Sequence, residues 1–159
     1  MARADLAREY FKSGLNCAQA VVLAYEDVMG MDRDQLLKLA APFGGGVGRM
    51  REICGTVSGM MIVLGAVFYN PAAPANAAKT ALYAREQEVA ARFRKENGSI
   101  VCRELLAGVG ADSGPIASER TPQYYKKRPC AELCACAAQI LETYLEEEGI
   151  LPFEGGNRA

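Results

Sequence analysis

Apolar residues recur along most of this chain at the three- and four-residue spacing of an amphipathic helix, and no segment alternates as a strand does. The spacing is clearest at Leu82, Val89 and Phe93, in a segment rich in Ala, Glu, Arg and Lys. The pattern predicts helices over residues 2–13, 17–29, 33–41, 49–69, 75–96 and 130–148, and a short helix that contains residues 102–108. We therefore expect an all-α fold, a single-domain bundle of about six helices spanning residues 1–159.

Polar residues and prolines mark where these helices begin. Asn16 and Asp32 are suited to the N-cap, because their side chains accept hydrogen bonds from the free N–H groups of a first turn. Ser99 is expected to cap the short helix, and Pro129 is suited to the first position of the last one. Two segments are expected to lack regular structure, namely residues 108–129, with several glycines and three prolines, and residues 151–159.

The segment at 49–69 is the most apolar part of the chain. No charged residue occurs from Ile53 to Ala78, but the apolar run only reaches the short limit of a membrane-spanning helix, and small and polar residues dilute it. We therefore expect a buried central helix and no membrane span. Gly55 and Gly59 form a GxxxG pattern, which lets two helix backbones approach closely.

The composition excludes several kinds of chemistry. The chain has 159 residues, six cysteines and no histidine, which excludes catalysis by Ser–His or Cys–His pairs and His-ligated zinc or haem. Its net charge is −1 at pH 7 and it has no basic stripe, so no nucleic-acid partner is expected. The first residues interleave charges and lack the apolar run of a signal peptide, which makes the cytoplasm the expected compartment.

In a reducing compartment, six cysteines indicate catalytic, redox or metal-binding thiols instead of a disulfide framework. Four of them lie at or near the start of a predicted helix, namely Cys17, Cys54, Cys102 and Cys130. The free N–H groups and the dipole of a first turn favour negative charge and lower a thiol's pKa. We expect the fold to bring these four thiols together as the catalytic residues.

The other two cysteines, Cys134 and Cys136, lie inside the last predicted helix, where a cysteine is most often a small buried apolar residue. Cys134 is one turn beyond Cys130, so it could also serve as a resolving thiol. The chain has no CxxC, and the zinc-ribbon and ferredoxin patterns are absent. A site assembled from distant helices is an open alternative, in which Cys17, Cys54, Cys102 and Cys130 ligate an iron–sulfur cluster or another soft metal.

A glycine run, FGGGVGR, precedes the central segment and contains Gly45 and Gly46. It fits no phosphate-binding motif, so a flexible turn that permits close helix packing is the favoured interpretation. The alternative is an anion pocket at the helix start with Arg49 and Arg51. Glu52 is a candidate for proton relay because it lies two residues from a key cysteine. The candidate binding residues around the thiols are therefore Gly45, Gly46, Arg49, Glu52, Gly55 and Gly59.

These segments together resemble a known family. The matching text is GLNCAQAV at 14–21, FGGGVGRMREICGTVSGMMIVLG at 43–65, CRELL at 102–106 and Cys130 after a proline. In order and context the cysteines resemble those of the C_GCAxxG_C_C family, although Thr56 stands where the family's CGAxxG motif has alanine. The resemblance implies redox activity without a settled substrate. The family's relatives include a domain of split-Soret cytochromes with an iron–sulfur centre, but this chain has no CxxCH, so the haem part does not carry over.

Three functions stay open at this point. In the first, Cys54 or Cys17 attacks a disulfide or another oxidised substrate and a second thiol resolves the mixed disulfide, or the clustered thiols transfer electrons. In the second, the same cysteines hold an iron–sulfur cluster or soft metal in an electron-transfer or sensing module. In the third, the protein is a non-catalytic helical binding protein. The redox partner is unknown, and the apolar surface of a glycine-rich bundle is compatible with a homodimer.

Overall fold

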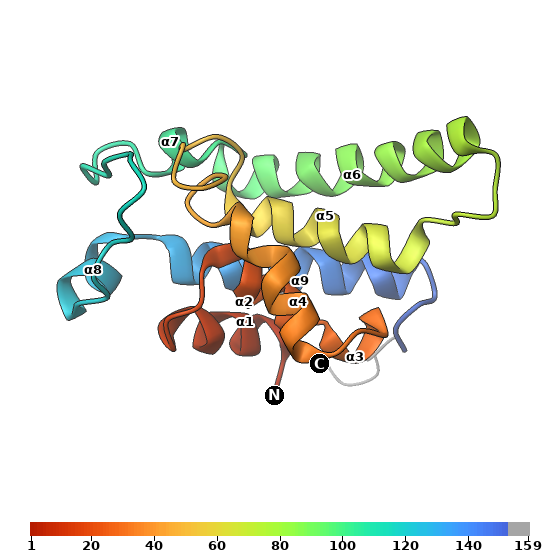
Figure 1. Ribbon diagram of the computed structural model, residues 1–159, viewed down its shortest axis with the longest axis horizontal. Coiled ribbons are helices and arrows are strands. Elements are labelled where there is room, and N and C mark those ends of the chain that lie inside the picture. The colour runs from red at the N-terminus through yellow and green to blue at the C-terminus, as the bar shows by residue number, and fades with distance from the viewer. Residues whose placement is uncertain (153–159) are drawn as a thin grey trace.

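The computed structural model describes residues 1–152 and shows an all-α fold (Figure 1). This part of the chain contains α1 (Arg3–Lys12), α2 (Cys17–Leu23), α3 (Glu26–Met29), α4 (Arg33–Ala40), a 3-10 turn (Ala41–Phe43), α5 (Gly55–Phe68), α6 (Ala75–Asn97), α7 (Cys102–Leu105), α8 (Pro122–Lys127) and α9 (Cys130–Glu147). Six of these nine helices have seven or more residues, which confirms the predicted all-α bundle. The prediction of a loose tail lies outside the described residues for 153–159.

Helix α5 runs through the middle of the bundle. In Figure 1 it lies between α6, which runs along its upper side, and α9 behind it, and α2 also packs on it. All of its first six residues are buried, and Met60, Val63 and Leu64 have no exposed surface. Its second half is partly exposed, so the predicted burial of the central helix holds mainly for its first half. Among residues 1–152 no helix has both the length and the apolar character needed to cross a bilayer.

The helix predicted over residues 17–29 is interrupted in the structure. Tyr25 leaves helical geometry, with φ −122° and ψ 16°, so that α2 and α3 are separate helices. The interruption frees the carbonyl of Ala24, which accepts a hydrogen bond of 2.7 Å from the Arg3 guanidinium. The Tyr25 hydroxyl donates to the carbonyl of Ala138 in α9. These contacts between distant segments compensate for the lost helical bonds, and helical spacing alone does not reveal them.

Two other helix starts also differ from the predictions. The loop predicted at 108–129 contains α8, in which the Thr121 side chain accepts a hydrogen bond from the N–H of Tyr124. Helix α7 has Val101 as its N-cap, and Ser99 instead accepts a hydrogen bond from the Val101 N–H. Pro129 is the N-cap of α9, one position before the first turn where it was expected.

The GxxxG pattern lies where α5 crosses α2. A Cβ atom at Gly59 would stand 2.9 Å from the Cβ of Val21, and one at Gly55 would stand 3.1 Å from the Cβ of Cys17. Real carbon atoms do not approach so closely without displacing their neighbours, so both glycines are needed for this crossing. The close helix approach expected from the pattern is therefore present, and it brings the first residue of α2 against the first residue of α5.

We predict that Gly59→Ala destabilises the protein while Gly65→Ala stabilises it. Gly65 lies on the same helix with open space around its Cβ position, so alanine there gains about 0.5–1 kcal/mol of helix propensity. At Gly59 the overpacking cost of about 1–3 kcal/mol outweighs that gain. Urea unfolding with an unchanged m-value measures both effects. Equal changes in the two variants would show that the crossing does not depend on glycine.

Candidate functional site

The glycine run forms a tightly wound left-handed segment. Residues 45–49 all have positive φ angles, between 55° and 69°, and Arg51 has φ 60°. Glycine adopts this region freely, whereas Val47, Arg49 and Arg51 each cost about 1–2 kcal/mol there. Backbone bonds from later N–H groups close the segment, for example from Glu52 to the Gly46 carbonyl at 2.9 Å. The central helix was predicted to begin near residue 49. It begins at Gly55 because the left-handed segment comes before it.

The left-handed segment leads into a short backbone pairing that places Cys54 near Cys102. After it, the Cys102 N–H donates to the Glu52 carbonyl at 2.6 Å, and the Cys54 N–H donates to the Ile100 carbonyl at 2.8 Å. The position of Gly46 leaves no room for a side chain, because a Cβ atom would stand 2.6 Å from the Cβ of Cys102. Two cysteines far apart in the sequence are thus held by a short backbone pairing.

The four predicted thiols occupy helix starts. Cys54 is the N-cap of α5, and the first residues of α2, α7 and α9 are Cys17, Cys102 and Cys130. A cavity of about 450 Å³ is lined by these last three, while Cys54 does not line it. Cys17 is partly exposed, the other three are buried, and all are free thiols. Cys17 is therefore the thiol of this group that a molecule in the cavity reaches most readily.

Cys17 has the environment of a thiolate. Hydrogen bonding from the Cys130 thiol, and next from the Cys134 thiol, lowers the pKa of Cys17 well below its ordinary value, although burial opposes the shift. The backbone N–H of Gly45 and the positive charge of Arg120 lower this pKa further. The thiolate is the reactive form of cysteine, so Cys17 is the best placed nucleophile of the site.

The other three thiols behave differently. Burial, followed by the charge of Cys17, raises the pKa of Cys54 to about 12, while its Sγ lies 3.1 Å from the Thr56 hydroxyl. Burial also raises the pKa of Cys102, against a contact of 3.8 Å from Arg51 Nη1 to its Sγ. Hydrogen bonding to Cys17 raises the pKa of Cys130. The expectation that a helix start lowers each thiol's pKa is wrong for these three, because burial and a neighbouring thiolate outweigh it.

Cys134 belongs to the site, although the sequence analysis favoured a passive role for it. It is fully buried, and its Sγ lies 3.9 Å from the backbone carbonyl of Cys17. Burial and hydrogen bonding to Cys17 raise its pKa. Its position one helical turn after Cys130 was the available sequence signal, since residues four apart lie on one helix face.

Of the remaining candidate binding residues, some line the cavity and others do not. Gly45 lines the cavity, as does Arg49. Gly55 and Gly59 contact α2, as described above, and have no part in the cavity lining. Glu52 pairs with Arg103 at the surface and does not line the cavity either. Its position gives no support to the proton-relay hypothesis.

The cavity wall also contains Arg120, Tyr124 and Arg128, none of which was among the candidate site residues. Arg120 donates hydrogen bonds to the carbonyls of Phe11 and Leu15, which fastens α1 to the segment before α8. The basic triplet at 126–128 was visible in the sequence, but only the fold shows which of its members faces the thiols.

The residues present do not form a recognisable metal centre. Among residues 1–152, no group of three or more Cys, Asp or Glu side chains is arranged so that it could hold a metal ion. The geometry therefore gives no support to the iron–sulfur or soft-metal alternative.

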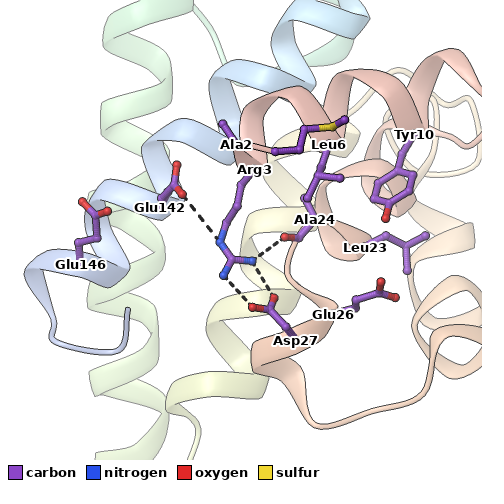
Figure 2. Close-up of a pocket in the computed structure, with 11 residues that line it drawn as sticks. Ala2, Arg3, Leu6, Tyr10, Leu23, Ala24, Glu26, Asp27, Glu142 and Glu146 are labelled. Carbon is purple, nitrogen blue, oxygen red and sulfur yellow. Dashed lines mark hydrogen bonds and ion pairs between the residues drawn. The ribbon is translucent and has the colours of Figure 1, made fainter. Parts of the chain in front are cut away.

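A second cavity, of about 520 Å³, is lined by residues of α1, α2, α3 and α9 and by no cysteine (Figure 2). Arg3 crosses it and donates to both carboxylate oxygens of Asp27, at 2.7 and 2.9 Å. It also lies 3.9 Å from Glu142 of α9. These contacts give Arg3 a structural role, because they join α1 to α3 and α9.

The fold is that of an all-α protein in which three cysteines from different helices line one cavity. The model of the family described as "Putative redox-active protein (C_GCAxxG_C_C)" matches residues 15–144, and the chain belongs to this family. Comparison with curated proteins and with solved structures gives no match.

We predict that Gly46→Ala destabilises the protein more than Gly48→Ala does. Both residues have positive φ, so each alanine costs about 1–2 kcal/mol of backbone strain. Gly48 has open space at its Cβ position, whereas a Cβ at Gly46 meets Cys102 and the Glu52 backbone N at 2.7 Å. The clash adds about 1–3 kcal/mol, to be measured by urea unfolding. If both variants lose the same free energy, the packing of the left-handed segment against Cys102 is not a source of stability.

Proposed function

We propose that this protein carries out thiol–disulfide exchange, with Cys17 as the attacking thiolate and Cys130 as the resolving thiol. The observation that carries the proposal is the position of Cys17, partly exposed at a cavity wall, with its pKa lowered by two neighbouring thiols and an arginine. A thiolate with a second thiol beside it is the arrangement that two-electron disulfide chemistry requires.

The proposed reaction has two steps. The Cys17 thiolate attacks one sulfur of a substrate disulfide, and the substrate S–S bond breaks to release one substrate thiolate. Cys130 then loses its proton to solvent or to the released thiolate, and its sulfur attacks Cys17. The mixed disulfide breaks, the second substrate thiolate leaves, and a Cys17–Cys130 disulfide remains. The substrate gains two electrons and the protein loses two, so that turnover needs an external thiol reductant.

Position favours Cys130 over Cys134 as the resolving thiol, because Cys130 lines the cavity beside Cys17 and Cys134 does not. The causes of their raised pKa values agree with this choice. For Cys130 the largest cause is hydrogen bonding to the Cys17 thiolate, and the positive charge of Arg128 acts in the opposite direction. For Cys134 the largest cause is burial. When Cys17 enters a mixed disulfide it loses its charge, so the pKa of Cys130 falls while the burial of Cys134 persists. The first step therefore prepares the second thiol.

We predict that alkylation of Cys17 reaches its full rate well below the pH needed by an ordinary thiol. A lowered pKa means a larger thiolate fraction at any given pH, so the midpoint lies below the reference value of about 8.5. Cys54, whose pKa is raised to about 12, stays unmodified over the same range. Iodoacetamide labelling from pH 5 to 9, followed by peptide mass spectrometry, measures both.

The matched controls for this prediction are Cys130→Ala and Cys130→Ser. Alanine removes the hydrogen-bond donor and should move the Cys17 midpoint to higher pH, whereas serine keeps a donor and should move it less. A Cys17 midpoint near that of a free thiol in the unmodified protein would contradict the assignment of the nucleophile.

We predict that a small neutral disulfide, bis(2-hydroxyethyl) disulfide, removes two free thiols from the reduced protein and that a dithiol reductant restores them. Cys17→Ser should abolish the reaction, because it removes the partly exposed thiol and the other two thiols at the cavity are buried. Cys130→Ser should stop it after the first step and accumulate the mixed disulfide on Cys17. Intact-mass and peptide mass spectrometry identify each species.

Two results would contradict the proposal. One is a Cys17→Ser variant that still forms an intramolecular disulfide at the rate of the unmodified protein. The other is a brown anaerobic preparation with bound iron and sulfide, which would assign the cysteines to a cluster and leave thiol exchange as an incomplete account.

A further inference from the structure

The cavity beside Cys17 is lined by positive charge. Four arginines lie in its wall, namely Arg49, Arg51, Arg120 and Arg128, and among residues 1–152 no aspartate or glutamate lines it. The chain as a whole has nearly balanced charge, with 18 basic and 19 acidic residues. The concentration of arginine at one cavity is therefore a local feature, and such clusters in concave sites attract and hold anions.

Arg51 lacks a carboxylate partner although it is buried, with 7% of its surface exposed. Its Nε donates to the backbone carbonyl of Asp112 at 2.9 Å, and its Nη1 lies 3.8 Å from Cys102 Sγ. Its Nη2 is buried without any hydrogen-bond partner. A buried guanidinium without a compensating negative charge is costly, so an anion in the adjacent cavity would stabilise it.

Arg120 and Arg128 also have no carboxylate partner within the part of the chain that the structure describes. Arg120 is held by backbone carbonyls and lies over the rings of Phe11 and Tyr124, at 4.4 and 4.9 Å. Arg128 also lies over the Tyr124 ring, 4.6 Å from its centre. These contacts orient both guanidinium groups without neutralising them.

The negative charges near the cavity do not balance the four arginines. Asp112 pairs with Arg49 at 3.0 Å, but its side chain is largely exposed and lies outside the cavity lining. The Cys17 thiolate supplies one more negative charge. Cys102 supplies none, because burial raises its pKa. At least two positive charges are left for a bound molecule.

We propose that the cavity binds a small disulfide that carries carboxylate groups, with the carboxylate beside Arg51 and Arg128 and one sulfur facing Cys17. The volume of about 450 Å³ suits a small molecule, and the apolar side chains of Leu106 and Pro115 also line the wall. This inference rests on the proposed thiol–disulfide exchange, and names the class of its substrate.

Dithiodiglycolate is the simplest probe of this class, and its reaction has the two steps proposed above. Cys17 attacks one sulfur, the S–S bond breaks, and one mercaptoacetate leaves. Cys130 then attacks Cys17 and releases the second mercaptoacetate, with its own proton passing to solvent or to the released thiolate. The disulfide is reduced by two electrons, and the Cys17–Cys130 pair is oxidised by two.

The test compares three small disulfides that differ in charge, namely dithiodiglycolate (anionic), bis(2-hydroxyethyl) disulfide (neutral) and cystamine (cationic). We expect the first to oxidise the protein about tenfold faster than the neutral probe, since a charge-assisted contact to arginine contributes about that factor. Cystamine should be slower than the neutral probe. Release of thiols and loss of protein thiols give the rates at fixed ionic strength, and added salt should reduce the preference.

Arg128→Gln should bring the ratio of the anionic to the neutral rate close to one. Arg51→Gln should have the same effect on the ratio. Because Arg51 is buried, this variant could fail to fold, and the test then rests on Arg128→Gln, since Arg128 is partly exposed. The matched control is Arg94→Gln, which removes the same charge from an exposed position of α6 away from the cavity and should keep the full ratio. Using the ratio cancels any change in the reactivity of the thiols themselves.

The outcomes separate this inference from the function on which it rests. Equal rates for the three disulfides, or a ratio that survives Arg128→Gln, would overturn the anionic substrate class and leave thiol exchange intact. Failure of all three disulfides to oxidise the protein would overturn the exchange mechanism itself. A tenfold preference that disappears in Arg128→Gln and persists in Arg94→Gln supports both.

Discussion

The close crossing of α2 and α5 is the constraint on which the rest of the structure depends. Gly55 and Gly59 remove the side chains that would hold the two helices apart. Cys17, at the start of α2, therefore lies against the start of α5, where its charge raises the pKa of Cys54. With bulkier residues at the crossing, α2 would move outward and Cys17 would leave the thiols of α9 that stabilise its negative charge.

The left-handed segment is the second constraint, and it explains why backbone strain is tolerated here. Val47, Arg49 and Arg51 occupy a region that side chains disfavour, and the glycines at 45, 46 and 48 accept the same region without cost. The winding turns Arg49 and Arg51 toward the cavity and pairs residues 52–54 with the start of α7. Strain of this kind persists when its surroundings determine it, and it is common at functional sites.

The sequence predicted the main helices and their close crossing, but it did not predict the left-handed segment or the pKa differences between the cysteines. Helical spacing located the main helices, and Asn16 and Asp32 form the capping boxes that their positions indicate. The GxxxG pattern located the close crossing. The left-handed winding could not be predicted, because Val47, Arg49 and Arg51 are residues that avoid it. The pKa differences between the four cysteines at helix starts could not be predicted either. They depend on burial and on contacts between thiols that are far apart in the sequence.

The coupling between the thiols gives the site an order of events. One negative charge on Cys17 raises the pKa of Cys54, Cys130 and Cys134, so a single thiolate dominates the reduced site. That thiolate is the one exposed to the cavity. Bond formation at Cys17 removes the charge that suppresses its neighbours, and Cys130, next to Arg128, gains most from that release because its pKa depends most on Cys17. In a protein without histidine, the loss of the Cys17 charge in the proposed exchange would itself lower the pKa of Cys130 and so favour the second attack.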